Sequence, residues 1–197
     1  MIIKKTLFAA TLISAALFVS CADEAEKKNP DSEKVADQAN EVKTETNTAE
    51  NDAEALVALS SQEHYLHAAA DYAAKNANQK QVKDLAAKIK ADHMTLGSEI
   101  KAFAGKRNYT VPDSMSNDFA KDVADMKDWK KGKEFDTKYV DEVIDEHEKV
   151  INKLENCSKD TKDADLKAWC DKTLPGLRAH LEEGRRVKDE IKTIYKS

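Results

Sequence analysis

The chain has 197 residues, of which 35% are charged and 6% aromatic, and its formal net charge at neutral pH is −5. An acidic chain without a basic stripe or an aromatic platform is a poor nucleic-acid binder, so we expect no nucleic-acid partner. There is no Gly-rich phosphate loop, and no Cys-x-x-Cys, His-Glu-x-x-His or Gly-x-Ser-x-Gly motif. Composition and motifs therefore assign no catalysed reaction and leave open whether the protein is an enzyme.

The first twenty residues have the pattern of a secretory signal peptide. Lys4 and Lys5 precede a mostly apolar run over 7–19, which is too short to span a bilayer. The segment ends in Ser20-Cys21, and this ending resembles the lipobox of bacterial lipoproteins, whose cysteine is acylated. We expect Cys21 to anchor a lipoprotein of the cell envelope to the outer membrane, on its periplasmic or its outer face. The alternative is an ordinary signal peptide with an unrelated cysteine.

The next segment, 21–50, is dominated by Glu, Lys, Asp, Asn and Thr. Val35 and Val42 are its only sizeable aliphatic residues. Such a segment cannot bury enough apolar surface to offset its ordering entropy. We predict a disordered acidic tether over 21–50 and one folded domain over 51–197, a length that suits a single core.

Apolar residues recur at spacings of three and four from residue 51 onward, and alternation with a period of two is nowhere sustained. The domain is therefore predicted to be all-α. Pro175 falls inside the last predicted helix and is expected to kink it or divide it in two. The four expected helices are Glu54–Ala77, Lys80–Lys106, Lys133–Cys157 and Asp163–Tyr195.

A long connection, 107–132, separates the second predicted helix from the third. The short connections join antiparallel neighbours, whereas this one is long enough to cross the full height of a bundle. Two hairpins joined by one crossover form an antiparallel, ferritin-like four-helix bundle, which is the fold we predict. A plain up-down-up-down bundle is the alternative.

Several short patterns resemble those of DUF4142, a family of domains of unknown function. They are Asp92-His93 in the second helix, Phe135-Asp136 and Tyr139-Val140 leading to His147 in the third, and Thr173-Leu174-Pro175 followed by His180 in the fourth. The resemblance covers residues 59–190 and implies an exported, ferritin-like four-helix bundle without an established biochemical role. The sequence departs from the family where Glu146 stands in place of the more frequent aspartate and where Ala68 replaces an acidic residue.

Each predicted helix carries one ionisable residue at an otherwise apolar, inward position: Glu63, His93, His147 and His180. Burying such groups unpaired is costly, so we expect them to meet. Glu63 and His93 are equally distant from the turn near residue 78, which places them at the same height of the first hairpin.

Two interpretations of this polar layer remain open. Three neutral imidazoles and a carboxylate could bind zinc, iron or copper, with Asp92 and Glu146 as outer or alternate ligands. Against a di-iron site, no histidine has a glutamate three residues before it, as ferritin-like di-iron sites require. The alternative is a hydrogen-bonded core network that only fixes the register of the helices.

Cys157 and Cys170 are each ten residues from a histidine of the second hairpin. In an oxidising compartment such a pair predicts a disulfide, which would hold His147 level with His180. The alternative is two reduced, buried thiols that act as small apolar side chains.

A second cluster on the first predicted helix consists of Glu63, His64, His67 and Asp71. Spacings of three and four could let these residues chelate a cation, although a solvated helix face has the same pattern.

Two functions follow from the sequence. The first is a non-catalytic, lipid-anchored helical module that is structural or binds a protein partner, another copy of itself or a ligand. The second is a metal-binding, ferritin-like protein or oxidoreductase that uses Glu63, His93, His147 and His180.

Overall fold

The structure is a computed structural model that describes residues 30–196, so the predicted signal peptide and Cys21 lie outside the described residues. All regular secondary structure in this range is helical, with six helices and no strand. The prediction of an all-α fold is thus confirmed. Among these six helices, none is both long and apolar enough to cross a membrane.

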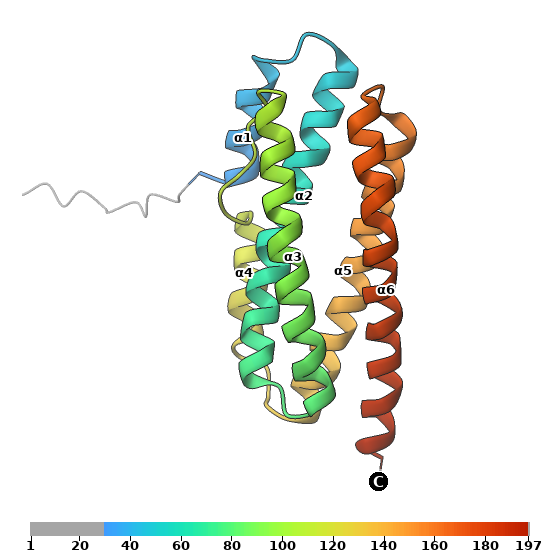
Figure 1. Cartoon of the computed structure of the whole chain (residues 1–197). Helices are drawn as coiled ribbons and strands as arrows, with labels where there is room; N and C mark the ends of the chain where they lie inside the picture. Colours follow the sequence, from blue (N-terminus) through green and yellow to red (C-terminus); the bar gives the residue numbers. More distant parts are fainter. Residues whose placement is uncertain (1–29, 197) are drawn as a thin grey trace, which may run out of the picture.

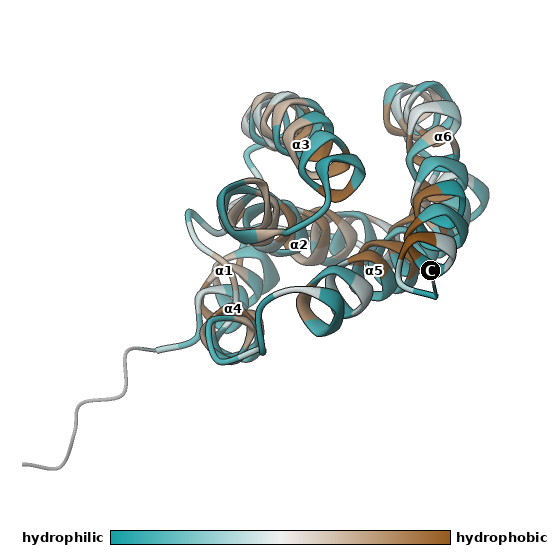
Figure 2. Ribbon diagram, turned by 90° about the horizontal axis from the view of Figure 1, so that it is seen from below, coloured by the Kyte–Doolittle hydropathy of each residue, from teal (hydrophilic) through white to brown (hydrophobic). Residues whose placement is uncertain are grey.

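Four long helices make up most of the fold (Figure 1). They are α2 (Asn47–Asn76), α3 (Lys80–Lys106), α5 (Lys133–Asp160) and α6 (Ala164–Ile194). α2 and α3 form one antiparallel hairpin, and α5 and α6 form the other. The hairpins lie side by side, with α2 against α5 and α3 against α6. In the view along the helices, hydrophobic residues gather on the sides that face one another (Figure 2).

The chain crosses from the first hairpin to the second through α4 (Asn117–Met126), which packs against α2. α3 ends and α5 begins at opposite ends of the long helices (Figure 1). Stacking of the Tyr65 and Phe119 rings, with centroids 4.7 Å apart, fixes α4 on α2. The connection expected to be long enough for a crossover does run from one end of the helices to the other.

A helix that the sequence did not predict, α1 (Ser32–Glu41), occupies part of the expected tether. Ala36 and Asn40 are buried, and Asn40 bonds the backbone of Thr110 twice, through Nδ2 to the carbonyl oxygen at 2.8 Å and through Oδ1 to the N–H at 2.7 Å. α2 also begins at Asn47, seven residues before its predicted start. The prediction of disorder was therefore wrong over 32–50. Contacts with residues distant in the sequence hold α1 in place, although few of its own residues are apolar.

Pro175 does not divide the last helix, because α6 is continuous from Ala164 to Ile194. A proline inside a helix removes one backbone hydrogen bond. Leu174 and Leu177 are both buried on either side of it, and their packing holds α6 together across the missing bond.

Asp136, at the start of α5, joins three parts of the fold at one end of the long helices. Its carboxylate accepts hydrogen bonds from the backbone N–H groups of Asn78 and Gln79, both at 2.8 Å, and from the hydroxyl of Tyr195 at 2.7 Å. Asn78 and Gln79 form the turn before α3, so Asp136 satisfies N–H groups that a helix start leaves unpaired. One buried carboxylate thereby fixes the α2–α3 turn and the end of α6 relative to α5.

Replacing Asp136 by alanine is expected to lower the free energy of unfolding by about 3 kcal/mol, because two partly buried backbone N–H donors and the Tyr195 hydroxyl lose a charged acceptor. Asp136→Asn keeps one oxygen acceptor and should cost less. Urea denaturation of both variants measures the difference. Asp84→Ala, which removes a carboxylate from the exposed pair with Lys80, serves as the control with little effect. A loss below about 0.5 kcal/mol in Asp136→Ala would contradict this role.

Candidate metal centre

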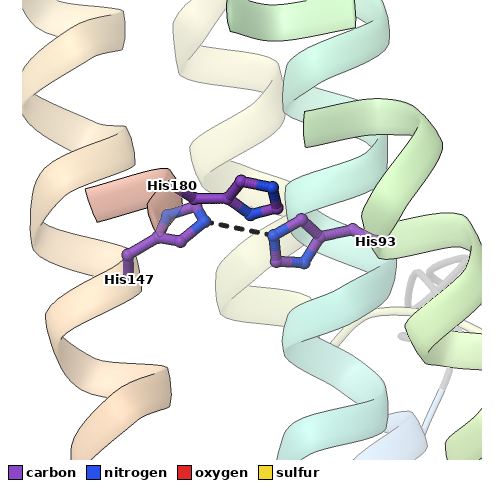
Figure 3. Close-up of side chains that lie close together, drawn as sticks. All are labelled: His93, His147 and His180. Carbon is purple, nitrogen blue, oxygen red and sulfur yellow. Dashed lines mark hydrogen bonds between the residues drawn. The ribbon is translucent and has the colours of Figure 1, made fainter. Parts of the chain in front are cut away.

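Three histidines from three different helices meet in the core. They are His93 of α3, His147 of α5 and His180 of α6 (Figure 3). One nitrogen of each ring lies within 4.8 Å of those of the other two, and the described residues contain no other His, Cys, Asp or Glu group that converges in this way. The ring centroids are 5.1, 5.5 and 5.4 Å apart, so the rings form a nearly equilateral triangle. All three side chains are buried.

Helix periodicity places each histidine in the core. On α3, His93 shares its buried face with Ile89, Leu96 and Ile100, at spacings of three, four and seven residues. A close approach of α5 and α6 near Gly184 brings the other two together. A Cβ atom there would lie only 3.2 Å from a side-chain carbon of Ile144, so glycine lets the helices pack tightly one turn from His180.

The outer nitrogen of each ring is bonded to an oxygen that can only accept a hydrogen bond. Carboxylate and carbonyl oxygens have no proton to donate, so each of these ring nitrogens carries the proton. The three bonds are His93 Nδ1 to Glu63 Oε2 at 2.6 Å, His147 Nδ1 to the Val143 carbonyl oxygen at 2.7 Å, and His180 Nε2 to Asp92 Oδ2 at 2.8 Å.

In the neutral rings, the remaining nitrogens therefore carry lone pairs, and they face the centre of the triangle. Nε2 of His93 and Nε2 of His147 are 3.1 Å apart (Figure 3). Nδ1 of His180 is buried and has no hydrogen-bond partner among the described residues. Lone pairs this close repel one another unless a shared proton or a cation lies between them. The three inward nitrogens are placed to act as ligands of one cation.

Burial keeps two of the imidazoles neutral. Desolvation and the nearby His93 and His180 rings together lower the pKa of His147 to about 3, against the opposing hydrogen bond to the Val143 carbonyl. Desolvation also lowers the pKa of His180, although Asp92 opposes this shift. Neutral imidazole is the form that binds metal ions, so the core holds these two side chains ready to bind at neutral pH.

Glu63, expected in the same layer, lies behind the His93 ring and outside the triangle. One of its carboxylate oxygens accepts the bond from His93, and the other, Oε1, is buried with no hydrogen-bond partner in residues 30–196. Asp92, expected as an outer ligand, holds the same position behind His180. Outer acceptors of this kind fix the ring orientation of metal-binding histidines and raise their basicity.

A family model for a domain of unknown function, DUF4142, matches residues 37–187, which is most of the chain. The protein belongs to the DUF4142 family. No curated protein and no solved structure matches the chain. The DUF4142 match includes all three histidines and both outer carboxylates, and it begins inside α1, before the predicted domain start at residue 51.

Glu146 of the DUF4142 domain does not reach the triangle, although it precedes His147 and was expected as an outer or alternate ligand. It is buried on another face of α5, where it accepts hydrogen bonds from Gln62 Nε2 at 2.6 Å and from Lys149 Nζ. Adjacent residues of a helix point about 100° apart, so only one of this pair can face the core centre.

The second expected cluster does not converge in the DUF4142 domain. Asp71 forms ion pairs with Lys75 and Lys90, which occupy its carboxylate. His64 Nε2 lies 3.3 Å from the carbonyl oxygen of Pro112. Within residues 30–196, His64 and His67 share no converging group of ligand atoms with Glu63 or Asp71.

Cys157 and Cys170 are free, buried thiols in the described part of the chain, so the expected disulfide is not present in the structure. Their side chains are nevertheless in contact, and this interaction raises the pKa of Cys170. The structure thus matches the alternative of two reduced thiols that pack in the core.

Sequence reasoning missed the Val143 carbonyl, which orients His147. The sequence indicates this acceptor only through its position four residues before the histidine in the same helix. A backbone carbonyl is present in every residue, so the residue type does not reveal it.

Proposed function

We propose that this protein is a metal-binding lipoprotein of the bacterial envelope, in which His93, His147 and His180 hold one zinc or copper ion inside a ferritin-like four-helix bundle. The observation that carries the proposal is the convergence of one nitrogen from each of the three rings, while the other nitrogen of each ring bonds an oxygen acceptor. The two antiparallel hairpins and the crossover through α4 support the bundle topology. Anchoring through Cys21 rests on the sequence pattern alone.

The donor set decides which metals we propose. Imidazole nitrogen suits zinc, copper, iron and nickel, whereas magnesium and calcium require oxygen ligands. Neither carboxylate near the site belongs to the inner set, since Glu63 and Asp92 both accept hydrogen bonds from the rings. A site of three neutral imidazoles favours the later first-row ions, of which zinc and copper are the most common in histidine sites.

Metal content tests the proposal directly. The protein is purified without chelator, incubated separately with zinc, copper and iron, and analysed by inductively coupled plasma mass spectrometry. We expect about one zinc or copper ion per chain, and we expect it to be absent when His93, His147 and His180 are all replaced by alanine. Circular dichroism shows whether this variant keeps its helices.

The chain offers a matched control, because it has five histidines and the other two, His64 and His67, lie outside the triangle. Replacing both by alanine should leave the metal content unchanged. A wild-type protein that binds no metal, or a triple variant that binds as much as the wild type, would refute the proposal. The single variant His180→Gln decides the question if the triple variant does not fold.

A further inference from the structure

A cavity of about 200 Å³ lies between α3 and α6, directly beside the histidine triangle. His93 and His180 form part of its wall. Its other lining residues include Leu96, Leu177, Gly176 and Thr173. Glu99 and Lys172 also line the cavity; the Lys172 side chain is exposed, and its Nζ lies 3.6 Å from Oε1 of Glu99. The triangle is therefore reached from a small, mostly apolar cavity.

Three side chains of residues 30–196 supply ligands, and no fourth joins them. The described residues bring no further His, Cys, Asp or Glu side chain into the converging group. Glu63 and Asp92, the closest carboxylates, are both occupied behind the rings. Structural zinc sites have four protein ligands, whereas sites with three keep one position for an exchangeable ligand. The ligand count places this site among those that keep one position for an exchangeable ligand.

Charge balance indicates the kind of ligand. A divalent ion with three neutral imidazoles carries two positive charges into the core, and the buried carboxylate of Glu63 offsets one of them. Asp92 also lines the cavity, but its side chain is half exposed and its charge is screened by solvent. Lys172 and Glu99, at the cavity, are of opposite charge and close together. One uncompensated positive charge in the core favours the binding of a ligand with one negative charge.

We propose that the fourth coordination position opens into the α3–α6 cavity and takes a small monoanion with an oxygen or nitrogen donor atom. This inference rests on the proposed metal site. The cavity, with a volume of about 200 Å³, has room for a few water molecules or an anion of a few non-hydrogen atoms. In water alone the ligand is water or hydroxide. The site is then one at which a small molecule is bound and exchanged at the metal.

Azide binding to the cobalt-loaded protein tests this inference, because Co²⁺ takes the same ligands as zinc and absorbs visible light. The full protein is loaded with Co²⁺, and its visible spectrum is recorded during an azide titration. We expect a saturable change of the spectrum in the wild-type protein.

Gly176→Leu is designed to fill the cavity without disturbing the fold. Within the described structure, a Cβ placed at Gly176 would have no atom within 4 Å apart from its chain neighbours and the nearby backbone of α6, and leucine is the better helix former. We expect this variant to bind Co²⁺ as the wild type does and to bind azide at least tenfold more weakly. Gly105→Leu is the matched control, because Gly105 also lies in a helix with no neighbour of its Cβ within 4 Å in residues 30–196, and it does not line the cavity.

Each outcome is decisive. Bound Co²⁺ whose spectrum does not respond to azide would overturn the open fourth position and leave the metal site standing. Equal azide affinity in Gly176→Leu and the wild type would overturn the cavity as its location. A protein that binds no Co²⁺ would overturn both this inference and the proposed function.

Discussion

Zinc at about a thousandfold excess over its dissociation constant is expected to raise the free energy of unfolding by about 4 kcal/mol. The three histidines come from helices distant in the sequence, so the unfolded chain has no comparable site. The free energy of metal binding therefore becomes free energy of folding. For a chain of this size the melting temperature should rise by roughly 8–16 °C. Differential scanning calorimetry with and without zinc measures this shift.

Variants separate the roles of the ligands and their outer partners. His147→Ala should abolish the stabilisation by zinc. Glu63→Gln leaves all three rings in place but replaces a charged acceptor, and it should weaken zinc binding by about 10- to 100-fold. Asp92→Asn should have a smaller effect, since Asp92 is half exposed. Equal stabilisation of the wild type and His147→Ala would mean that zinc binds elsewhere.

The sequence predicted which residues form the polar layer more reliably than it predicted their roles. Glu63 and His93 were placed at one height by their equal distance from the turn, and the structure puts them 2.6 Å apart. Height along a helix does not determine which way a side chain turns. Glu63 consequently contacts the far side of the His93 ring instead of the centre of the triangle, and the sequence contains no sign of this difference.

The parts of the fold that were predicted incorrectly depend on contacts distant in the sequence. The low apolar content of residues 32–41 indicated disorder, but Asn40 and Thr110 bond each other across the connection after α3. Pro175 is expected on local grounds to kink the last helix or divide it, and the division does not occur because packing of its buried neighbours keeps α6 continuous. Residue type and spacing predict local conformational preference, whereas the conformation of these two segments is determined by tertiary contacts.

In the metal-free protein, the free energy of unfolding is expected to fall by about 2 kcal/mol between about pH 8 and pH 5 because of His147 alone. The pKa of His147 is about 3 in the folded protein, compared with 6.5 for the free side chain. The unfolded chain therefore takes up the proton first as the pH falls. The stability contributed by the neutral ring is complete above about pH 6.5 and is lost progressively toward pH 3. His180, whose pKa is also lowered, adds to the loss in the same direction.

Urea denaturation in the presence of a chelator, at several pH values across this range, measures how the free energy of unfolding depends on pH. His147→Leu is the informative variant, because leucine fills the buried position and does not titrate. Its free energy of unfolding should depend less steeply on pH by up to about 1.4 kcal/mol per pH unit. The same slope in both proteins would show that the folded core leaves the pKa of His147 at its value in the unfolded chain, and it would contradict the expected effect of burial on this ring.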